Sequence, residues 1–185
     1  MPPGESIGKY RLVRLIGRGG MGLVYEAVHP ELRKRVAIKT LHADIAAEPE
    51  PLGRFLKEGE AASRIKHPNV VNVLDVGAHE GAPFLVMEYL EGENLAERFK
   101  RDPAGPIDAV VDLLLPAIAA VATGHDEGVI HRDLKPANIF LERGRRGEVT
   151  PKVLDFGISK IMGTPAELSL TGKATVVGTL SYMAP

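Results

Sequence analysis

The chain has 185 residues, of which 44% are hydrophobic and 25% are charged, and its net charge at pH 7 is −1. These values are typical of a soluble globular protein of one domain or two small lobes, and they give no indication of a nucleic-acid partner. The absence of cysteine excludes disulfide bonds, thiol catalysis and cysteine-ligated metals.

Neither a signal peptide nor a membrane segment is predicted. Residues 1–5 lack a basic region followed by an apolar core. The most apolar stretch, residues 109–123, is expected to be too short to span a bilayer, and it contains Asp112 and Pro116. We therefore expect a cytoplasmic protein.

The first half of the chain is predicted to be an antiparallel sheet with one helix. Alternating or apolar runs bounded by turn residues predict five strands: 10–16, 23–28, 36–41, 70–76 and 84–89. Residues 42–53 are rich in proline and glycine and are expected to form a loop, whereas residues 54–66 have helical periodicity.

The second half is predicted to be mainly helical. Residues 90–92 end the strand pattern, and helices are expected over 94–101 and 107–127. Short apolar runs predict three strands: 129–130, 139–141 and 152–154. Residues 158–179 lack periodicity and are expected to form a long loop.

A glycine-rich turn occupies residues 17–22, with the sequence Gly17, Arg18, Gly19, Gly20, Met21, Gly22. The pattern alone fits a dinucleotide-binding fingerprint, a phosphate-binding hairpin or a plain flexible turn. A dinucleotide-binding fold needs a helix directly after the glycines, whereas the β-branched and aromatic residues over 23–28 predict a strand. The glycines are therefore expected at the tip of a hairpin, where their backbone amides can approach phosphate oxygens.

A lysine and a glutamate are expected to point into the same interior. In the strand 36–41, the period of two places Ala37 and Lys39 on one face. On the helix 54–66, Glu58 falls in the apolar stripe of Phe55 and Ile65. A buried Lys39–Glu58 ion pair is one reading, and a Lys39 that extends to solvent from the sheet is the other.

Polar residues in two loops supply the groups that phosphoryl transfer requires. Asp133 can accept a proton from a hydroxyl, and Lys135 can neutralise charge on a transferring group. Asn138 and Asp155 are hard oxygen ligands of the kind that Mg²⁺ prefers. For any one acidic residue taken singly, the capping of a turn is the favoured interpretation, and only the ordered set between apolar strands favours phosphoryl transfer.

Together these motifs resemble the protein kinases, and in particular the eukaryotic-like (Hanks-type) Ser/Thr kinases of bacteria. The resemblance runs from about residue 10 to residue 185. It includes the glycine-rich turn, the Val36-Ala37-Ile38-Lys39 strand, Glu58, the His131-Arg132-Asp133 loop and Asp155-Phe156-Gly157. The order and separation of these motifs also fit the family.

The resemblance implies an α+β, bilobal fold of the protein-kinase type. Its N-lobe would have a five-stranded antiparallel sheet and one helix, and its C-lobe would be partial and mainly helical. The expected divisions are an N-terminal extension over 1–9, an N-lobe over 10–89, a hinge over 90–93 and a partial C-lobe over 94–185.

The resemblance also implies that the cofactors are ATP and Mg²⁺ and that Asp133 is the catalytic base. Lys39, paired with Glu58, would hold the α- and β-phosphates, and Asn138 and Asp155 would bind Mg²⁺. Met87 resembles the gatekeeper residue, and Glu88 to Leu90 the segment whose backbone binds adenine. The residues that would sandwich the adenine ring are Ile16, Val24, Ala37 and Phe140.

Lys135 and Thr179 resemble the Ser/Thr-specific version of the family, so the implied partner is a protein with a Ser or Thr acceptor. Arg132 beside Asp133 resembles kinases that are activated by phosphorylation of the loop at 158–179. Thr171 and Thr175 are the first candidate sites, and their autophosphorylation would involve a kinase homodimer.

The family pattern continues past Ala184-Pro185 with a glutamate and further helices. We therefore expect this chain to be a fragment with weak or no transfer activity on its own, and its helix 107–127 to carry apolar residues without partners: Leu113, Leu114, Ile118 and Val121. The alternatives are an inert truncated product and a non-catalytic module for nucleotide binding or protein interaction.

Overall fold

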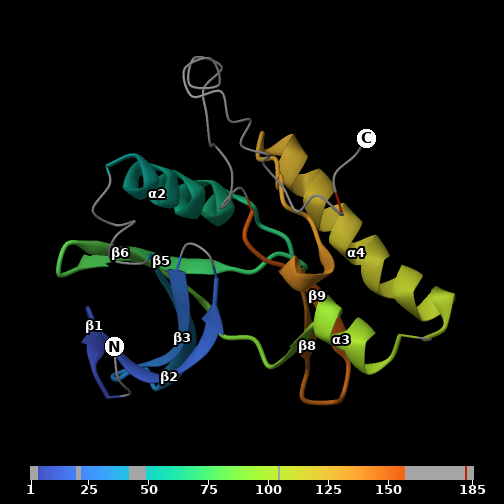
Figure 1. Ribbon diagram of the computed structural model, residues 1–185, viewed down its shortest axis with the longest axis horizontal. Coiled ribbons are helices and arrows are strands. Elements are labelled where there is room, and N and C mark those ends of the chain that lie inside the picture. Colours follow the sequence, from blue (N-terminus) through green and yellow to red (C-terminus); the bar gives the residue numbers. More distant parts are fainter. Residues whose placement is uncertain (1–3, 20–21, 42–48, 104, 157–181, 183–185) are drawn as a thin grey trace, which may run out of the picture. The chain divides into compact units, whose positions relative to one another are not determined.

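The computed structural model describes residues 4–19, 22–41, 49–103, 105–156 and 182. It divides the chain into two compact units. Unit 1 is Met1–Lys66 with Val71–Glu91, and unit 2 is His67–Val70 with Gly92–Pro185. Both units combine helices and strands, as Figure 1 shows, so the predicted α+β class is confirmed.

Unit 1 is built on a six-stranded antiparallel sheet in the order β1-β2-β3-β4-β6-β5. The strands are β1 (Ser6–Ile7), β2 (Tyr10–Arg18), β3 (Gly22–His29), β4 (Lys34–Leu41), β5 (Val73–His79) and β6 (Ala82–Glu88). Five of them correspond to predicted strands, with ends that differ by a few residues. The sixth, β1, pairs with β2 and lies in residues for which no strand was predicted.

The sheet of unit 1 buries one of its faces in a core. Its buried members are Ile7, Tyr10, Leu12, Tyr25, Ala27, Val36, Ile38, Phe84 and Val86. Tyr10 Oη donates a hydrogen bond to Asp75 Oδ2 at 3.1 Å, and this bond joins β2 to β5. Because β2 and β5 are not neighbours in the strand order, the sheet is curled rather than flat.

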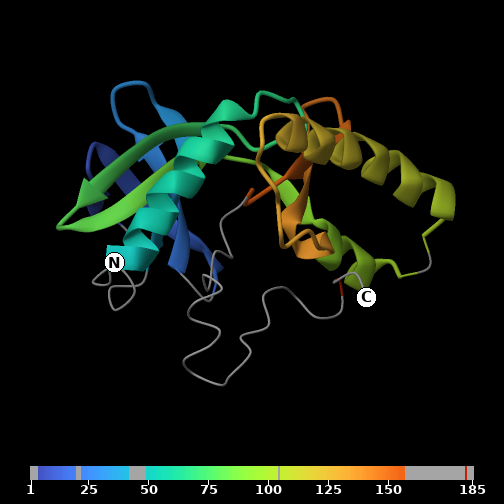
Figure 2. The same ribbon diagram turned by 90° about the horizontal axis from the view of Figure 1, so that it is seen from above.

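Helix α2 (Pro49–Arg64) lies against β5 and β6 of unit 1, as Figures 1 and 2 show. The predicted loop over 42–53 is wrong from residue 49 onward, because the helix begins at Pro49 and includes Pro51. The first four backbone N–H groups of a helix have no acceptor within the helix, so a proline there loses no hydrogen bond. The two prolines therefore mark the first turn of α2 rather than a loop.

Gly59 has a packing role in the middle of α2. A glycine inside a helix costs about 1 kcal/mol relative to alanine. A Cβ atom at Gly59 would lie 2.7 Å from Leu85 Cδ1 and 3.4 Å from Val76 Cγ2. The missing side chain therefore lets α2 approach β5 and β6 closely, and Leu85 is only 1% exposed.

Unit 2 contains a three-stranded sheet in the order β7-β8-β9 and two helices. The elements are β7 (Gly92–Asn94), α3 (Leu95–Arg101), α4 (Ile107–Asp126), β8 (Ile139–Arg143) and β9 (Val149–Val153), with a short 3₁₀ turn, η1 (Pro136–Asn138). The predicted strand at 129–130 is wrong. The Val129 N–H donates to Gly124 O at 2.8 Å. This residue therefore supplies a hydrogen bond to a backbone carbonyl at the C-terminal end of α4 and is not part of a sheet.

Helix α3 begins with a capping box. Asn94 Oδ1 accepts a hydrogen bond from the Glu97 N–H at 2.9 Å, and Glu97 Oε2 accepts one from the Asn94 N–H at 3.0 Å. Gly92, at the start of β7, has φ +150, and a Cβ there would lie 2.0 Å from Leu141 O. These features fix where the strand turns into the helix.

Helix α4 packs on β9, and its residues Ala117, Ala120 and Gly124 are buried. Its other side exposes Ile107, Val111, Leu115 and Ile118. Of the residues expected to lack partners, Ile118 is exposed, and Leu113, Leu114 and Val121 are partly buried. By length and composition the 20-residue helix could cross a membrane. The prediction that the apolar stretch 109–123 is too short to span a bilayer is therefore wrong. A single such helix is weak support for a membrane span, because the helices of soluble domains also pass this test.

We predict opposite outcomes for two Gly→Ala substitutions within α2. Gly53→Ala should leave the free energy of unfolding unchanged or raise it by up to about 1 kcal/mol, because nothing lies within 4 Å of the added Cβ. Gly59→Ala should lower it relative to Gly53→Ala, because overpacking against the buried Leu85 typically costs about 1–3 kcal/mol. Urea unfolding of both variants measures the difference, and equal stabilities would contradict the packing role of Gly59.

Candidate functional site

The predicted site residues fall into two sets, one in each unit, and each set is described by itself. In unit 1 the glycine-rich turn joins β2 to β3. Gly17 pairs with Val24, and the Gly19 N–H donates to Gly22 O at 2.9 Å. The predicted hairpin is confirmed, and the strand β3 excludes the dinucleotide-binding alternative, which needs a helix there. Gly20 and Met21 lie outside the described residues.

Gly22 is required by the close approach of β3 and β4. A Cβ atom at this position would lie 1.7 Å from Thr40 O, a backbone atom that cannot move aside. Gly17, by contrast, has room for a Cβ at ordinary contact distance from Val24. Gly22 therefore has a structural reason to be glycine.

The residues predicted around the nucleotide share one face of the unit 1 sheet. Val24 of β3 pairs with Lys39 of β4, and Lys39 pairs with Leu85 of β6. Ala37, two residues from Lys39, pairs with Met87. Directly paired residues of antiparallel strands point to the same face of the sheet. The predicted residues Val24, Ala37, Lys39 and Met87 therefore lie, together with Leu85, on the face opposite to the core. Ile16 lies at a register shift of β2, between Leu15 and Gly17, and is 40% exposed.

The predicted partner of Lys39 is located on α2, but its side chain lies outside the described part of the chain. Lys39 itself is half-buried, and Glu58 is in the helix that packs against β5 and β6. Both alternatives for Lys39, the ion pair and the extension to solvent, therefore stay predictions.

The segment after Met87 is anchored to residue 72. The Glu88 N–H donates to Asn72 O at 3.0 Å, and the Asn72 N–H donates to Glu88 Oε1 at 2.8 Å. Met87 is 8% exposed, and Leu90 is half-buried. The end of β6 thus has a defined backbone position at the place where adenine binding is predicted.

In unit 2, His131 joins the loop of Asp133 to the end of β9. His131 Nε2 lies 2.8 Å from Leu154 O, and Nδ1 lies 3.3 Å from the Asp133 N–H. A carbonyl can only accept and an N–H can only donate, so the neutral ring carries its proton on Nε2. The ring is 2% exposed and lies 5.1 Å from the ring of Phe156. Burial lowers the pKa of His131, which favours this neutral form.

The Asp133 carboxylate is held from two sides. Lys135 Nζ forms an ion pair with Asp133 Oδ2 at 2.7 Å. Asn138 Nδ2 donates to the backbone oxygen of Asp133 at 2.8 Å and to Oδ2 at 3.3 Å. The Asp133 side chain is 10% exposed. These contacts fix the rotamer of a carboxylate that can accept a proton, which is the geometry that a general base needs.

Asn138 and Asp155 are brought together by the pairing of β8 with β9. Ile139 pairs with Val153, and the Leu154 N–H donates to Asn138 O at 2.9 Å, so Asp155 follows directly after a residue bonded to Asn138. Because Asn138 Nδ2 points at Asp133, its amide oxygen is directed away from that residue. An amide oxygen and a carboxylate are hard ligands, and this donor set fits Mg²⁺, which takes few protein ligands.

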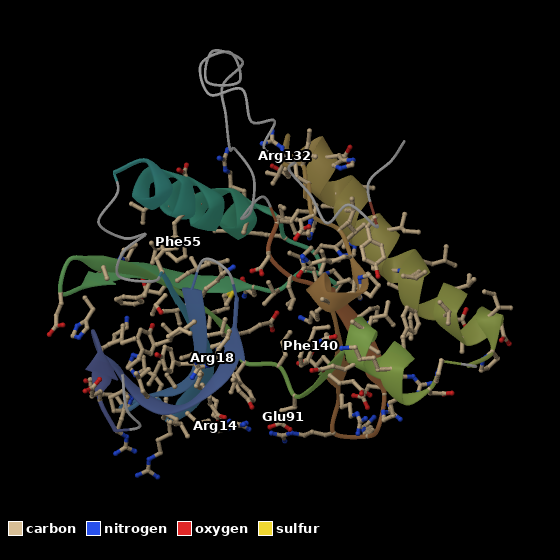
Figure 3. The ribbon with its side chains drawn as sticks, viewed as in Figure 1. Arg14, Arg18, Phe55, Glu91, Arg132 and Phe140 are labelled. Atoms are coloured by element: carbon tan, nitrogen blue, oxygen red, sulfur yellow. The ribbon has the colours of Figure 1, made fainter. Side chains whose placement is uncertain are left out.

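Two residues of this region have a left-handed backbone. Asp155 has φ +55 and Arg132 has φ +61. Residues other than glycine rarely adopt this conformation, and such strain concentrates at functional sites. Phe156, which follows Asp155, is 1% exposed. Figure 3 labels Arg132 and Phe140, and Phe140 is half-buried in β8.

Some of the predicted site lies outside the described residues, and some of the observed site was missed. Thr171, Thr175 and Thr179 all fall within 157–181, which the structure does not describe. The two hydrogen bonds by which the His131 ring links Leu154 to Asp133 were not predicted, because both partners of the ring are backbone groups. The apolar Val129, which is 8% exposed and two residues before it, was the signal that this histidine is buried.

Comparison with known proteins identifies relatives across almost the whole chain. A protein-family profile described as "Protein kinase domain" matches residues 10–185. The serine/threonine-protein kinase Pkn1 of Myxococcus xanthus is 42% identical over 182 residues, which are 98% of this chain and 26% of Pkn1. The kinase pkn3 of the same organism is 42% identical over 179 residues, which are 96% of this chain and 33% of pkn3.

A solved structure gives the same result for the fold. The Mycobacterium tuberculosis PknI kinase domain is similar with a TM-score of 0.75 and 31% identity, and the match covers 94% of this chain and 70% of that domain. The chain spans about a quarter to a third of the length of the two curated relatives.

We predict that His131 makes the stability of the chain depend on pH. A histidine whose pKa is lowered on folding binds fewer protons in the folded state, so stability is complete above its ordinary pKa of 6.5 and falls as the pH drops below that value. His131→Phe keeps the contact with Phe156 but cannot be protonated. The stability advantage of the wild type over this variant should therefore shrink between pH 7.5 and pH 5.5.

Urea unfolding of the metal-free chain at the two pH values measures this change. His125→Asn, an exposed position on α4, is the matched control for the loss of one histidine. If the difference in the free energy of unfolding between the wild type and His131→Phe stays constant with pH, the result would contradict a buried, neutral His131.

Proposed function

The chain belongs to the protein kinase domain family, and on this premise we propose that it transfers the γ-phosphoryl group of Mg·ATP to a serine or threonine hydroxyl of a protein substrate. The main support is the arrangement at Asp133, whose carboxylate is held by Lys135 at 2.7 Å and by Asn138 at 3.3 Å. A fixed, ionised carboxylate next to two potential metal ligands suits the removal of a proton from an attacking hydroxyl.

We assign the chemical step to unit 2. The oxygen of the substrate hydroxyl forms a bond to the γ-phosphorus of ATP, and Asp133 accepts the proton of that hydroxyl. The bond between the γ-phosphorus and the oxygen that bridges it to the β-phosphate breaks, which releases ADP. Lys135 balances the negative charge on the transferring group. Asn138 and Asp155 would hold Mg²⁺, which would supply positive charge to offset the negative charge of the phosphates.

We assign nucleotide binding mainly to unit 1. The backbone of the glycine-rich turn, residues 17–22, contacts the phosphates, and Lys39 binds them with support from Glu58. Met87 is the gatekeeper, and the backbones of Glu88 and Leu90 bind the edge of the adenine. The apolar contacts to the ring within this unit are Ile16, Val24 and Ala37. The boundary between the units at residues 91 and 92 supports a hinge over 90–93.

We propose that the Ser/Thr preference comes from Lys135 and Thr179, and that activation involves phosphorylation of Thr171 or Thr175. Arg132 is exposed beside Asp133, and its guanidinium would attract a phosphate on the segment 158–179. A kinase homodimer is the proposed route to that phosphorylation. We place the domain in the cytoplasm, where ATP and Mg²⁺ are available.

We predict that Asp133→Asn and Lys39→Met each lower phosphate transfer by roughly 100-fold or more, because one removes the base and the other a phosphate contact. The assay is incorporation of phosphate from Mg·ATP into a protein substrate by the intact protein, followed by mass spectrometry. Asp112→Asn and Lys100→Met, at exposed positions on α4 and α3, are the matched controls and should keep wild-type activity.

Wild-type turnover by Asp133→Asn would overturn the role of the base. A wild-type protein that binds Mg·ATP but transfers no phosphate to substrate or to itself would favour the alternative, a nucleotide-binding or interaction module without catalysis.

A further inference from the structure

A cluster of four charged side chains and one tyrosine lies at the end of β6 in unit 1. Its members are Arg14 of β2, Glu26 of β3, Arg35 of β4, and Tyr89 and Glu91, which follow β6. We refer to these five residues as the hinge cluster. Figure 3 labels Arg14 and Glu91, and both lie at the same edge of unit 1.

Glu26 is the centre of the hinge cluster. It is 6% exposed, although most glutamates are at the surface. Its Oε2 accepts a hydrogen bond from Arg14 Nε at 2.8 Å, and its Oε1 accepts one from Arg35 Nε at 2.9 Å. Burial by itself opposes the ionisation of Glu26, but the bonds from Arg35 and Arg14 outweigh it and lower its pKa. The buried carboxylate is therefore charged and oriented by both arginines.

The two arginines extend from Glu26 to the segment after β6. Arg14 Nη2 donates to Tyr89 Oη at 3.2 Å, and the Arg35 guanidinium carbon lies 3.9 Å from the centre of the Tyr89 ring. Arg35 Nη1 also forms an ion pair with Glu91 Oε1. Tyr89 is thus held at its hydroxyl by one guanidinium and across its ring face by the other.

The hinge cluster begins where the backbone pairing of β6 stops. The ladder between β4 and β6 ends with the pair Val36–Glu88, and on the other side of β6 the ladder with β5 ends at Val73–Met87. Residues 89–91 therefore continue beyond both ladders. One further pair along β4 would place Arg35 opposite Tyr89, and there the side chain of Arg35 makes the contact instead.

The hinge cluster lies directly beside the proposed adenine contacts. Glu26 follows Val24 by two residues, Arg35 precedes Ala37 by two, and Tyr89 follows Met87 by two. Residues two apart on a strand point to the same face and are about 6–7 Å apart along it. Glu26 pairs directly with Ala37, which in turn pairs with Met87, and Arg35 lies one step further along the same face of β4. The hinge cluster and the proposed adenine contacts are therefore neighbours on one face of the sheet.

The hinge cluster differs from an ordinary surface ion pair, which contributes little to stability. Two cations face two anions, the central carboxylate is almost fully buried, and the flat guanidinium of Arg35 both stacks and donates. Lysine cannot reproduce that combination. The loss of one member would leave an opposite charge in a partly buried place without its partner.

We infer that Arg14, Glu26 and Arg35 are positioning residues that fix the backbone of residues 89–91 in the conformation that presents the hinge to a purine base. The part of this inference that concerns the purine rests on the proposed function, whereas the fixing of residues 89–91 does not. None of the three touches the reacting atoms, and they act through Tyr89 and Glu91.

The first test is hydrogen–deuterium exchange of the nucleotide-free 185-residue chain. Arg35→Ala and Glu26→Gln should speed exchange at the amides of residues 89–91 by roughly tenfold, which corresponds to about 1.4 kcal/mol. Tyr89→Phe and Arg35→Lys, milder changes that keep the fold, should show smaller increases. Arg11→Ala, an exposed arginine on β2, is the matched control and should match the wild type.

Two exchange results would overturn the inference. One is unchanged exchange at residues 89–91 in the Arg35 and Glu26 variants. The other is an equal increase at Tyr25 and Ile38, buried residues of β3 and β4, because that would show general destabilisation rather than local release. If Arg35→Ala does not fold, Arg35→Lys and Tyr89→Phe decide by the same criteria.

The second test separates the inference from the proposed function. In the intact protein, Arg35→Ala should raise the KM for Mg·ATP about tenfold and leave kcat within about twofold, because ground-state binding is what the hinge supplies. A fall in kcat at unchanged KM would overturn the link to the purine. If the wild type binds no nucleotide, the proposed function fails, and the exchange experiment still decides whether the hinge cluster fixes residues 89–91.

Discussion

The antiparallel pairing of β3, β4 and β6 is the constraint on which unit 1 depends. Paired side chains point to the same face, so a single register places Val24, Ala37, Lys39 and Met87 on one side and the apolar core on the other. A shift of one residue in that register would exchange the two sets. The burial of Ile38 and Val86, both fully buried, therefore specifies where the proposed ligand-binding residues point.

In unit 2 the pairing of β8 with β9 has the corresponding role. It places Asn138 beside Leu154, and His131 connects Leu154 to Asp133 through its two ring nitrogens. The proposed base and the two potential metal ligands are thus tied to one short stretch of sheet by the backbone bond between Asn138 and Leu154 and by the ring of His131. The left-handed φ of Asp155 is held within this framework, which is the usual way that strained residues persist at functional sites.

The hinge cluster and the end of β6 show how side chains extend the reach of a sheet. Backbone hydrogen bonds hold the chain as far as Glu88, and the Arg35 and Arg14 side chains then contact Tyr89. A buried carboxylate, Glu26, orients both arginines. If residues 89–91 present their backbone groups to a ligand, as proposed, those groups cannot also take part in a ladder, and attachment through side chains leaves them available.

The sequence by itself determined the periodic elements, the hairpin of the glycine-rich turn and the shared face of Ala37 and Lys39, because these follow from local spacing and backbone chemistry. Only the tertiary structure decided that α2 starts at Pro49, that Gly59 is needed for close packing, and that residues 129–130 serve the end of α4. It also assembled Glu26, Arg35 and Glu91, which are up to 65 residues apart in the chain. Such contacts depend on strand order and helix placement, which local patterns do not encode.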